Sequence, residues 1–158
     1  MAACAVVRDV VLTVTGVDLL DLEPGDGRLT TDVLPVLREL RPHLTASTFD
    51  SVCAEGHPQG LRFTAAYDGD RCVGVAGWRI VATTANLRKL YVDDLVTTAD
   101  ARSTGVGRTL LAALLERAEA AGCTALDLDS GVQRADAHRF YMREGLTITS
   151  FHFARRLG

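Results

Sequence analysis

The sequence predicts an α+β fold, in which helices cover the faces of a mixed β-sheet. In the middle of the chain, Leu61, Phe63, Ala65 and Tyr67 recur at every second position, and short polar turns separate this segment from two further strand-like segments, which is typical of hairpin strands. Further along, helical and strand patterns follow one another, and this combination is typical of a mixed sheet. The 158 residues are 47% hydrophobic and 23% charged, which favours one domain over residues 1–158 and excludes wholesale disorder.

The first part of the chain is expected to form a strand, a loop and a helix. β-branched apolar residues predict the strand at Val10–Val14, and Pro, Gly and Asp residues predict the loop at Asp21–Arg28. Valine and leucine then recur at helical spacing over Val33–Leu40. Thr31 or Asp32 is expected to provide the N-cap of this helix.

A second helix is expected over Thr45–Glu55, with Phe49, Val52 and Cys53 on one face. After a turn at residues 57–60, apolar residues recur at every second position instead of at helical spacing. The chain is therefore expected to contain three antiparallel strands, at Leu61–Tyr67, Cys72–Ala82 and Leu87–Thr97.

The helical period returns after Val106 and marks a long amphipathic helix. A short strand is expected at Ala125–Asp129. Ser130, with a glutamine three residues later, has the spacing of a capping box and predicts the start of a last helix, which Gly145 should end. A final strand is expected at Leu146–Phe153.

Composition excludes several classes of function. A net charge of −3 argues against a general nucleic-acid-binding protein, which needs a strongly basic face. No apolar run approaches the ~20 residues that span a bilayer, and no basic segment precedes the apolar N-terminus, so neither a membrane span nor a signal peptide is expected. The four cysteines form no Cys-x-x-Cys pair, so we expect no metal site and a reduced, cytoplasmic environment.

The segment Arg102–Thr109, between a strand and an amphipathic helix, is the most informative about function. Gly105 and Gly107 let a ligand approach the backbone closely, and the first N–H groups of the helix lie at the positive end of its dipole. This arrangement predicts a phosphate or pyrophosphate site, although a Gly-x-Gly before a helix also occurs as a plain tight turn. The third glycine of the dinucleotide fingerprint and the Gly-Lys-Ser/Thr of a P-loop are absent.

The spacing Arg102-x-x-Gly105-x-Gly107 after a strand resembles the pyrophosphate loop of the GNAT family of acyl-CoA-dependent N-acyltransferases. The resemblance covers about residues 73–153, roughly half of the chain, and the first half matches only in the order of its elements. It implies a GNAT-like mixed, mostly antiparallel sheet of six to seven strands, flanked by about four helices.

A second matching segment runs from Ala137 to Gly145 and contains Tyr141. In the family this segment reads Ala-x-x-φ-Tyr-x-x-x-Gly, where φ is apolar. Arg134 stands where the family commonly has an asparagine that contacts the coenzyme. The resemblance implies acetyl-CoA as the co-substrate, with its pantetheine arm along the preceding strand. The candidate coenzyme-binding residues are Leu95, Val96, Thr97, Arg102, Ser103, Thr104, Gly105, Val106, Gly107, Arg108, Thr109 and Arg134.

Transfer of an acetyl group to an amine requires a base for the amine and an acid for the leaving thiolate. Asp93 and Asp94 are the candidate bases. Strand alternation places Asp93 on the face of Leu95, and the resemblance ranks Asp93 first, because some family members have an acidic residue near the acceptor amine nine positions before the loop arginine. A bulge in this strand would favour Asp94 instead. Tyr141 is the candidate acid, and a backbone N–H near Val96 is expected to stabilise the oxyanion. The alternatives are structural ion pairs for the carboxylates and core packing for the tyrosine.

Two histidines are weaker candidates. His138 lies one helical turn before Tyr141 and could act as a base, although a surface or core role is the more common one. His152 on the last predicted strand could line the acceptor pocket. Asp129, Ser130 and Arg134 are expected to form a capping and ion-pair network.

We therefore expect a cytoplasmic acetyl-CoA-dependent N-acetyltransferase that transfers the acetyl group directly to a primary amine, because no cysteine has a motif suited to an acyl carrier. The alternative is a catalytically silent acyl-CoA-binding module with a sensing or regulatory role. Small amines, amino acids, aminoglycosides, polyamines and peptide lysines all remain open as acceptors. We expect no nucleic-acid or membrane partner, and analogy with the family allows a homodimer through the last strands.

Overall fold

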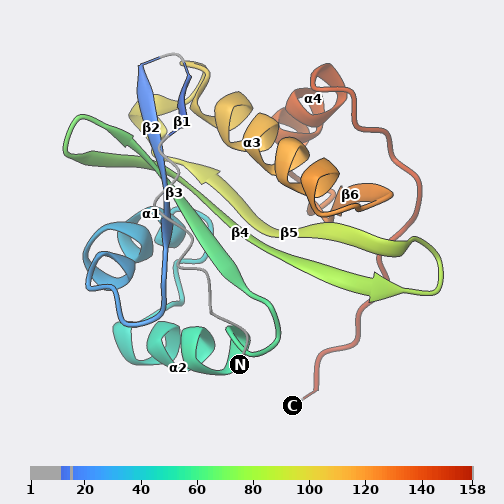
Figure 1. The fold of residues 1–158 in the computed structure, drawn as a ribbon, viewed down its shortest axis with the longest axis horizontal. Coiled ribbons are helices and arrows are strands. Elements are labelled where there is room, and N and C mark those ends of the chain that lie inside the picture. The colour runs from blue at the N-terminus through green and yellow to red at the C-terminus, as the bar shows by residue number, and fades with distance from the viewer. Residues whose placement is uncertain (1–11, 15, 158) are drawn as a thin grey trace, which may run out of the picture. The chain divides into compact units, whose positions relative to one another are not determined.

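A computed structural model describes residues 12–14 and 16–157 of the chain (Figure 1). The chain divides into two compact units, one up to Asp127 and one from Leu128 onward. The two units are described separately below. No helix among the described residues combines the length and the apolar character needed to cross a membrane.

The first unit is built on a sheet of six strands in the order β1-β2-β3-β4-β5-β6 (Figure 1). Neighbouring strands from β1 to β5 are antiparallel, and β6 ends at Leu128, the first residue of the second unit. The predicted α+β class and the mostly antiparallel sheet are confirmed. The strands are β1 (Leu12–Val14), β2 (Val17–Leu22), β3 (Arg62–Asp68), β4 (Arg71–Thr83), β5 (Leu87–Thr97) and β6 (Ala125–Leu128).

The first hairpin differs from the prediction. β1 confirms the C-terminal part of the strand expected at Val10–Val14, whose first two residues lie outside the described residues. β2 was not predicted, and it includes the start of the loop expected at Asp21–Arg28. Its two aspartates lower its β-propensity. Pairing with β3, from Asp18 opposite Tyr67 to Leu22 opposite Phe63, nevertheless holds it in the sheet.

The first helix begins earlier than expected. A π-helical turn, η1 (Leu29–Val33), leads directly into α1 (Leu34–Arg38). Thr31 and Asp32 therefore lie inside the helical segment, and the prediction that one of them caps it is wrong. The observed N-cap residue, Arg28, makes no capping hydrogen bond with its side chain.

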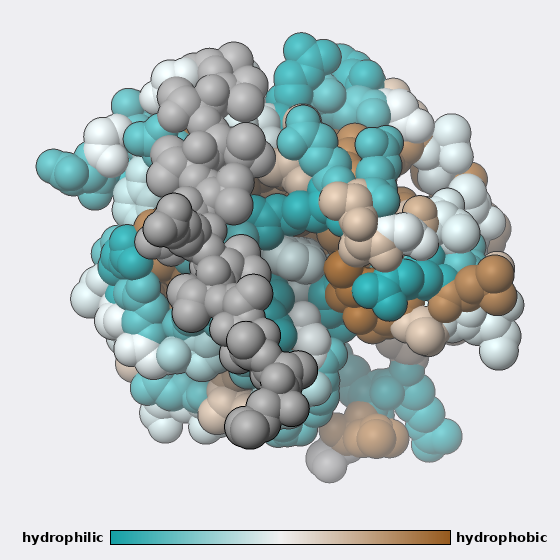
Figure 2. Space-filling view, viewed as in Figure 1, coloured by the Kyte–Doolittle hydropathy of each residue, from teal (hydrophilic) through white to brown (hydrophobic). Residues whose placement is uncertain are grey.

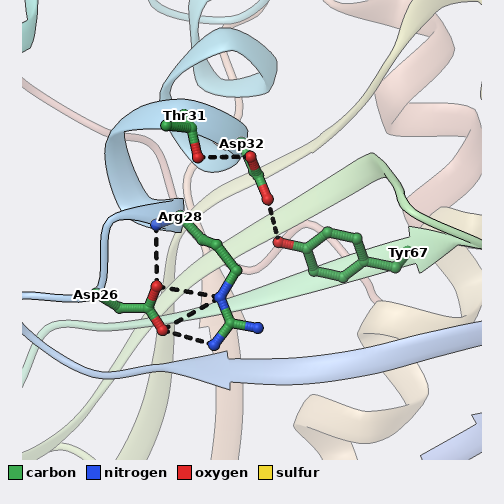
Figure 3. Close-up of polar contacts among 5 residues, drawn as sticks. All are labelled: Asp26, Arg28, Thr31, Asp32 and Tyr67. Atoms are coloured by element: carbon green, nitrogen blue, oxygen red, sulfur yellow. Dashed lines mark hydrogen bonds and ion pairs between the residues drawn. The ribbon is translucent and has the colours of Figure 1, made fainter.

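Asp32 instead connects η1 to the sheet (Figure 3). The phenol of Tyr67 on β3 donates to Asp32 Oδ2 at 2.7 Å, and the Thr31 hydroxyl donates to Oδ1 at 2.6 Å. Nearby, Arg28 Nη2 pairs with Asp26 Oδ2 at 2.6 Å. Burial, reinforced by the bond to Asp32, raises the pKa of Tyr67 well above its ordinary value. The phenol is thus a permanent donor at neutral pH.

The second helix, α2 (Ala46–Gly56), forms where the sequence predicts it. Thr45 caps it in a reciprocal box with Thr48: Thr48 N–H donates to Thr45 Oγ1 at 3.1 Å, and Thr45 N–H donates to Thr48 Oγ1 at 2.9 Å. Phe49 is fully buried, but Val52 is exposed, so the apolar face is narrower than expected.

Helices cover both faces of the sheet. Leu34 and Leu37 of α1 and Phe49 of α2 pack with Val75 and Val96 of the sheet in one core cluster. On the other face lies α3 (Val106–Ala120), which contacts β4 and β5. A Cβ on Gly74 would lie 2.7 Å from a Val106 methyl group and 3.0 Å from Leu110. Only glycine therefore allows α3 to approach β4 this closely.

A polar network lies on the α3 face. The indole N–H of Trp78 donates to Thr64 Oγ1 at 3.0 Å, and that hydroxyl donates to Asp21 Oδ1 at 2.6 Å. Arg117 of α3 bonds Asp21 Oδ2 at 2.6 Å and places its guanidinium 5.1 Å from the centre of the Trp78 ring. These contacts join β2, β3, β4 and α3, and they satisfy the polar atom of the buried Thr64.

The second unit contains α4 (Ala135–Arg143). Its N-cap residue is Arg134, so the capping box expected at Ser130 is wrong; Ser130 Oγ is buried and has no hydrogen-bond partner among the described residues. The strand expected at Leu146–Phe153 is not formed either. Its apolar alternation is real, but a strand also needs a neighbour for its backbone groups. The described part of the chain supplies none, since the sheet ends at six strands.

The second unit also exposes large apolar side chains. These are Val132, Met142, Ile148, Phe151, Phe153 and Leu157. On the face of the molecule seen in Figure 2, hydrophobic groups are interspersed with hydrophilic ones.

Candidate functional site

The loop between β5 and α3 has the geometry of an anion site. Gly105, the N-cap of α3, has a φ of +100°, and a Cβ at this position would meet nothing within 4 Å. The helical ladder begins with Thr109 N–H donating to Gly105 O at 2.9 Å. The N–H groups of Val106 and Gly107 therefore precede the ladder, at the positive end of the helix dipole. The backbone here is open to a negatively charged ligand.

The first residues of the loop are held by α1. Glu39, the residue after α1, accepts from Ala99 N–H at 3.3 Å and from Arg102 Nη2 at 3.1 Å. Arg102, Ser103 and Thr104 are exposed. The structure thus places all predicted loop residues, from Arg102 to Thr109, in one continuous exposed segment and the first turn of α3.

The end of β5 leads into this loop. Leu95, Val96 and Thr97 pair with β4 on one side. The observed contacts of β6 lie at the other end of β5: Thr124 N–H donates to Arg88 O at 2.9 Å, and Lys89 Nζ pairs with Asp127 Oδ2 at 2.8 Å.

A β-bulge interrupts β5 at the two candidate bases. Gly77 of β4 pairs with Asp94 and Trp78 pairs with Val92, so Asp93 is the extra residue. Asp94 Oδ2 lies 3.4 Å from the position of a Cβ on Gly77, on the sheet face covered by α1 and α2. Simple strand alternation therefore fails at this point.

Ion pairs locate the Asp93 carboxylate. Arg79 Nε contacts Asp93 Oδ2 at 2.8 Å, and Arg79 Nη2 contacts Oδ1 at 2.9 Å. Arg79 is two residues after Gly77 and shares its face of β4, so Asp93 lies on the same face as Asp94. The expectation that Asp93 shares a face with Leu95 is wrong, because the bulge reverses the alternation. Hydrogen bonding to Asp93 raises the pKa of Arg79 further above its ordinary value.

Asp94 has a different partner. Arg41 Nε, from the segment after α1, contacts Asp94 Oδ1 at 2.9 Å, and Arg41 Nη2 lies 3.5 Å from the backbone oxygen of Asp93. The structure therefore brings two carboxylates and two guanidiniums together on one sheet face. Sequence reasoning missed Arg41 and Arg79. Arg79 carried a signal, as a charged residue inside an apolar strand, whereas Arg41 carried none.

Tyr141 and Arg134 lie in the second unit. Tyr141 is on α4, half-buried, with its ring 5.3 Å from that of Phe140. Burial raises the pKa of Tyr141, and the nearby positive charge of Arg134 opposes this shift. The phenol is therefore protonated at neutral pH and able to donate.

The two histidines have local partners in the same unit. His138 Nε2 lies 2.9 Å from Gly131 O. His152 Nδ1 lies 3.3 Å from Asp129 Oδ2. The carboxylate of Asp129 is thus the observed partner of the histidine that was expected on the last strand.

Sequence comparison places these features in a known family. The model of the acetyltransferase (GNAT) family matches residues 30–146. The uncharacterized N-acetyltransferase YhdJ of Bacillus subtilis (strain 168) is 34% identical over 123 residues, which cover 77% of this chain and 87% of that protein. The aminoalkylphosphonate N-acetyltransferase of Salmonella typhimurium is 38% identical over 66 residues, 42% of this chain and 43% of that protein.

Solved structures share the fold. An acetyltransferase of Trypanosoma brucei has a TM-score of 0.73 at 22% identity, covering 89% of this chain and 99% of that one. The aminoglycoside N-acetyltransferase AAC(6')-Iy, in complex with CoA, has a TM-score of 0.78 at 15% identity, covering 89% and 94%. With the family match over most of the chain, these findings show that the protein belongs to the GNAT family and is an acyl-CoA N-acetyltransferase.

Proposed function

We propose that the protein uses acetyl-CoA as its co-substrate and transfers the acetyl group directly to the primary amine of a small acceptor. The observation that carries this proposal is the loop between β5 and α3. Its open left-handed glycine, Gly105, precedes a helix N-terminus whose first N–H groups lie outside the helical ladder. That arrangement suits a pyrophosphate group.

The proposal includes further coenzyme contacts near the loop and along β5. Arg102 and Arg108, both exposed, would add positive charge near the pyrophosphate. The backbone of Leu95, Val96 and Thr97 would pair with the pantetheine arm, because the observed contacts of β6 lie at the opposite end of β5. Arg134 is a further candidate contact.

The chemistry assigns one role to each candidate side chain. Asp94, directly or through a water molecule, takes a proton from the acceptor ammonium, and the neutral nitrogen attacks the thioester carbonyl carbon. A backbone N–H near Val96 stabilises the oxyanion. The C–S bond then breaks, and Tyr141 donates a proton or a strengthening hydrogen bond to the departing thiolate.

Asp94 is preferred to Asp93 as the base. Arg79 holds Asp93 through both carboxylate oxygens, and a bidentate pair leaves a carboxylate poorly placed to accept a proton. Both carboxylates lie on the face covered by α1 and α2, so the preference rests on the way in which Asp93 is paired.

The relatives support a small acceptor. One curated relative is an aminoalkylphosphonate N-acetyltransferase and one structural neighbour is an aminoglycoside N-acetyltransferase. Both names describe acceptors that carry an amine on a small molecule.

The test is a thiol-release assay with acetyl-CoA and a panel of amines, accompanied by calorimetry of coenzyme binding. Release of CoA that depends on an amine supports the proposal. Coenzyme binding without transfer to any amine would instead indicate a silent acyl-CoA-binding module. Absence of any coenzyme binding would contradict both functions.

A further inference from the structure

The charges at the bulge of β5 are balanced in pairs. Asp93 pairs with Arg79, and Asp94 pairs with Arg41. Four formal charges therefore sum to zero on one face of the sheet. An acceptor with several ammonium groups, such as a polyamine or an aminoglycoside, is best bound by carboxylates that have no cationic partner. Here each candidate carboxylate already has one.

The two ion pairs differ in how many N–H donors of the guanidinium bond the carboxylate. The side chain of Arg79 is 23% exposed and uses both Nε and Nη2 on Asp93. The side chain of Arg41 is 46% exposed, and only its Nε bonds the carboxylate of Asp94. A guanidinium has five N–H donors in a planar fork. Arg41 therefore presents donors to solvent beside the candidate base, while Arg79 is committed to its pair.

We infer that the acceptor is a small amine that also carries an anionic group, a carboxylate or a phosphonate, and that Arg41 binds this group. The inference rests on the proposed function. The acceptor ammonium lies against Asp94 and its anion lies against Arg41. Because positive and negative groups then alternate, a zwitterionic molecule enters an electroneutral site. After the amine loses its proton, the anion remains bound and keeps the nitrogen in place for attack.

This arrangement makes Arg41 a specificity-determining residue. Its removal withdraws the partner of the acceptor's anion, and it also removes the Nε contact to Asp94, which affects all amine acceptors alike. The additional loss for anionic amines should show mainly in KM.

The experiment compares matched acceptors. β-Alanine is compared with β-alaninamide, and 2-aminoethylphosphonate with ethylamine, so that the carboxylate and phosphonate arms are read separately; spermidine serves as the polycationic acceptor. In the wild-type protein, at least one anionic amine should have a kcat/KM about ten-fold or more above its partner without an anionic group and above spermidine. Equal efficiencies within both pairs, or a preference for spermidine, would overturn the inference.

Three variants test the residue. Arg41→Gln should lower kcat/KM for the preferred anionic amine about ten-fold more than for its partner without an anionic group. Arg41→Lys should recover part of the loss, because it restores charge without the planar fork. Arg88→Gln, an exposed arginine at the other end of β5, makes the same change in net charge and should have no effect. An equal loss for all acceptors in Arg41→Gln would assign Arg41 a structural role.

Failure of the proposed function can be distinguished from failure of the inference about Arg41. If no amine is acetylated although acetyl-CoA binds, the transferase proposal fails. Calorimetry of β-alanine and 2-aminoethylphosphonate on the CoA complex then judges the inference by itself. Binding that Arg41→Gln weakens supports it, and absence of binding to the wild-type protein contradicts it.

Discussion

The loop at the start of α3 and the bulge of β5 lie in the same unit but are built in different ways. The loop presents backbone N–H groups around Gly105, and these groups come from residues adjacent in the sequence; only the first residues of the loop have a distant partner, Glu39. The bulge presents side chains whose partners come from distant segments: Arg41 reaches Asp94 across 53 residues. Local sequence therefore determines the candidate coenzyme site, whereas packing determines the candidate acceptor site.

Replacing the candidate base is expected to have the largest effect. Asp94→Asn should lower kcat about 100-fold near neutral pH, within the range typical of general-base catalysis. The loss should shrink at high pH, where free amine is abundant. The measurement is a pH–rate profile under saturating acetyl-CoA. The matched variant Asp93→Asn, whose carboxylate is held by Arg79, should lose less; the reverse order would make Asp93 the base.

Removing the candidate acid is expected to have the next largest effect. Tyr141→Phe keeps the ring and deletes the hydroxyl, and it should lower kcat roughly 10- to 100-fold while acetyl-CoA affinity stays within a few-fold. Since burial raises the pKa of Tyr141, the donor form should persist, and activity should fall only as pH rises beyond about 10. Wild-type kcat in a folded variant, with chemistry limiting the rate, would remove Tyr141 from the mechanism.

Adding a negative charge to the loop between β5 and α3 tests whether the backbone N–H groups of this loop bind the pyrophosphate. Gly105→Asp should weaken acetyl-CoA binding by about ten-fold or more, equivalent to ~1.4 kcal/mol, because a carboxylate would repel the pyrophosphate. Gly105→Asn is the matched control, with nearly the same shape and the same φ requirement but no charge. Calorimetry measures both variants. Equal affinities would show that no anion binds at this helix terminus.

The smallest effect is expected away from both regions, at the contact between Tyr67 and Asp32. Tyr67→Phe should lower the free energy of unfolding by about 1 kcal/mol through the lost hydrogen bond and leave kcat unchanged. Because the folded-state pKa of Tyr67 is raised, the wild-type protein should lose this contribution as pH rises above about 10, the unfolded value. Urea unfolding at neutral and alkaline pH measures the effect of the substitution and the pH dependence of the wild-type stability. A large loss of kcat would place Tyr67 in the site.

The sequence predicted best what depends on local pattern. β5 and α3 begin and end close to the expected residues, since a polar turn marks the start of β5 and α3 has a strong helical period. β2 was missed because two aspartates interrupt its short apolar pattern, and only its pairing with β3 reveals it. The strand expected after Gly145 had the right alternation but has no neighbour among the described residues.

The candidate site divides in the same way. Arg102–Thr109 could be recognised from glycine spacing next to a helix. The partners of the carboxylates could not, because the bulge depends on the glycine opposite, Gly77, and the ion pairs depend on where β4 and α1 place Arg79 and Arg41. Partners that tertiary packing brings together can be identified only from the folded structure.

Trp78 gives the bulge an optical reporter. It is the single tryptophan of the chain, and it pairs with Val92 immediately beside the extra residue Asp93. Its indole N–H donates to Thr64, and its ring lies next to the Arg117 guanidinium. These two contacts hold the ring in one environment. Any shift of β5 on ligand binding changes the environment of this one fluorophore. The intrinsic fluorescence of Trp78, on the α3 face, should therefore report acceptor binding on the face covered by α1 and α2. This measurement needs neither an added label nor enzymatic turnover.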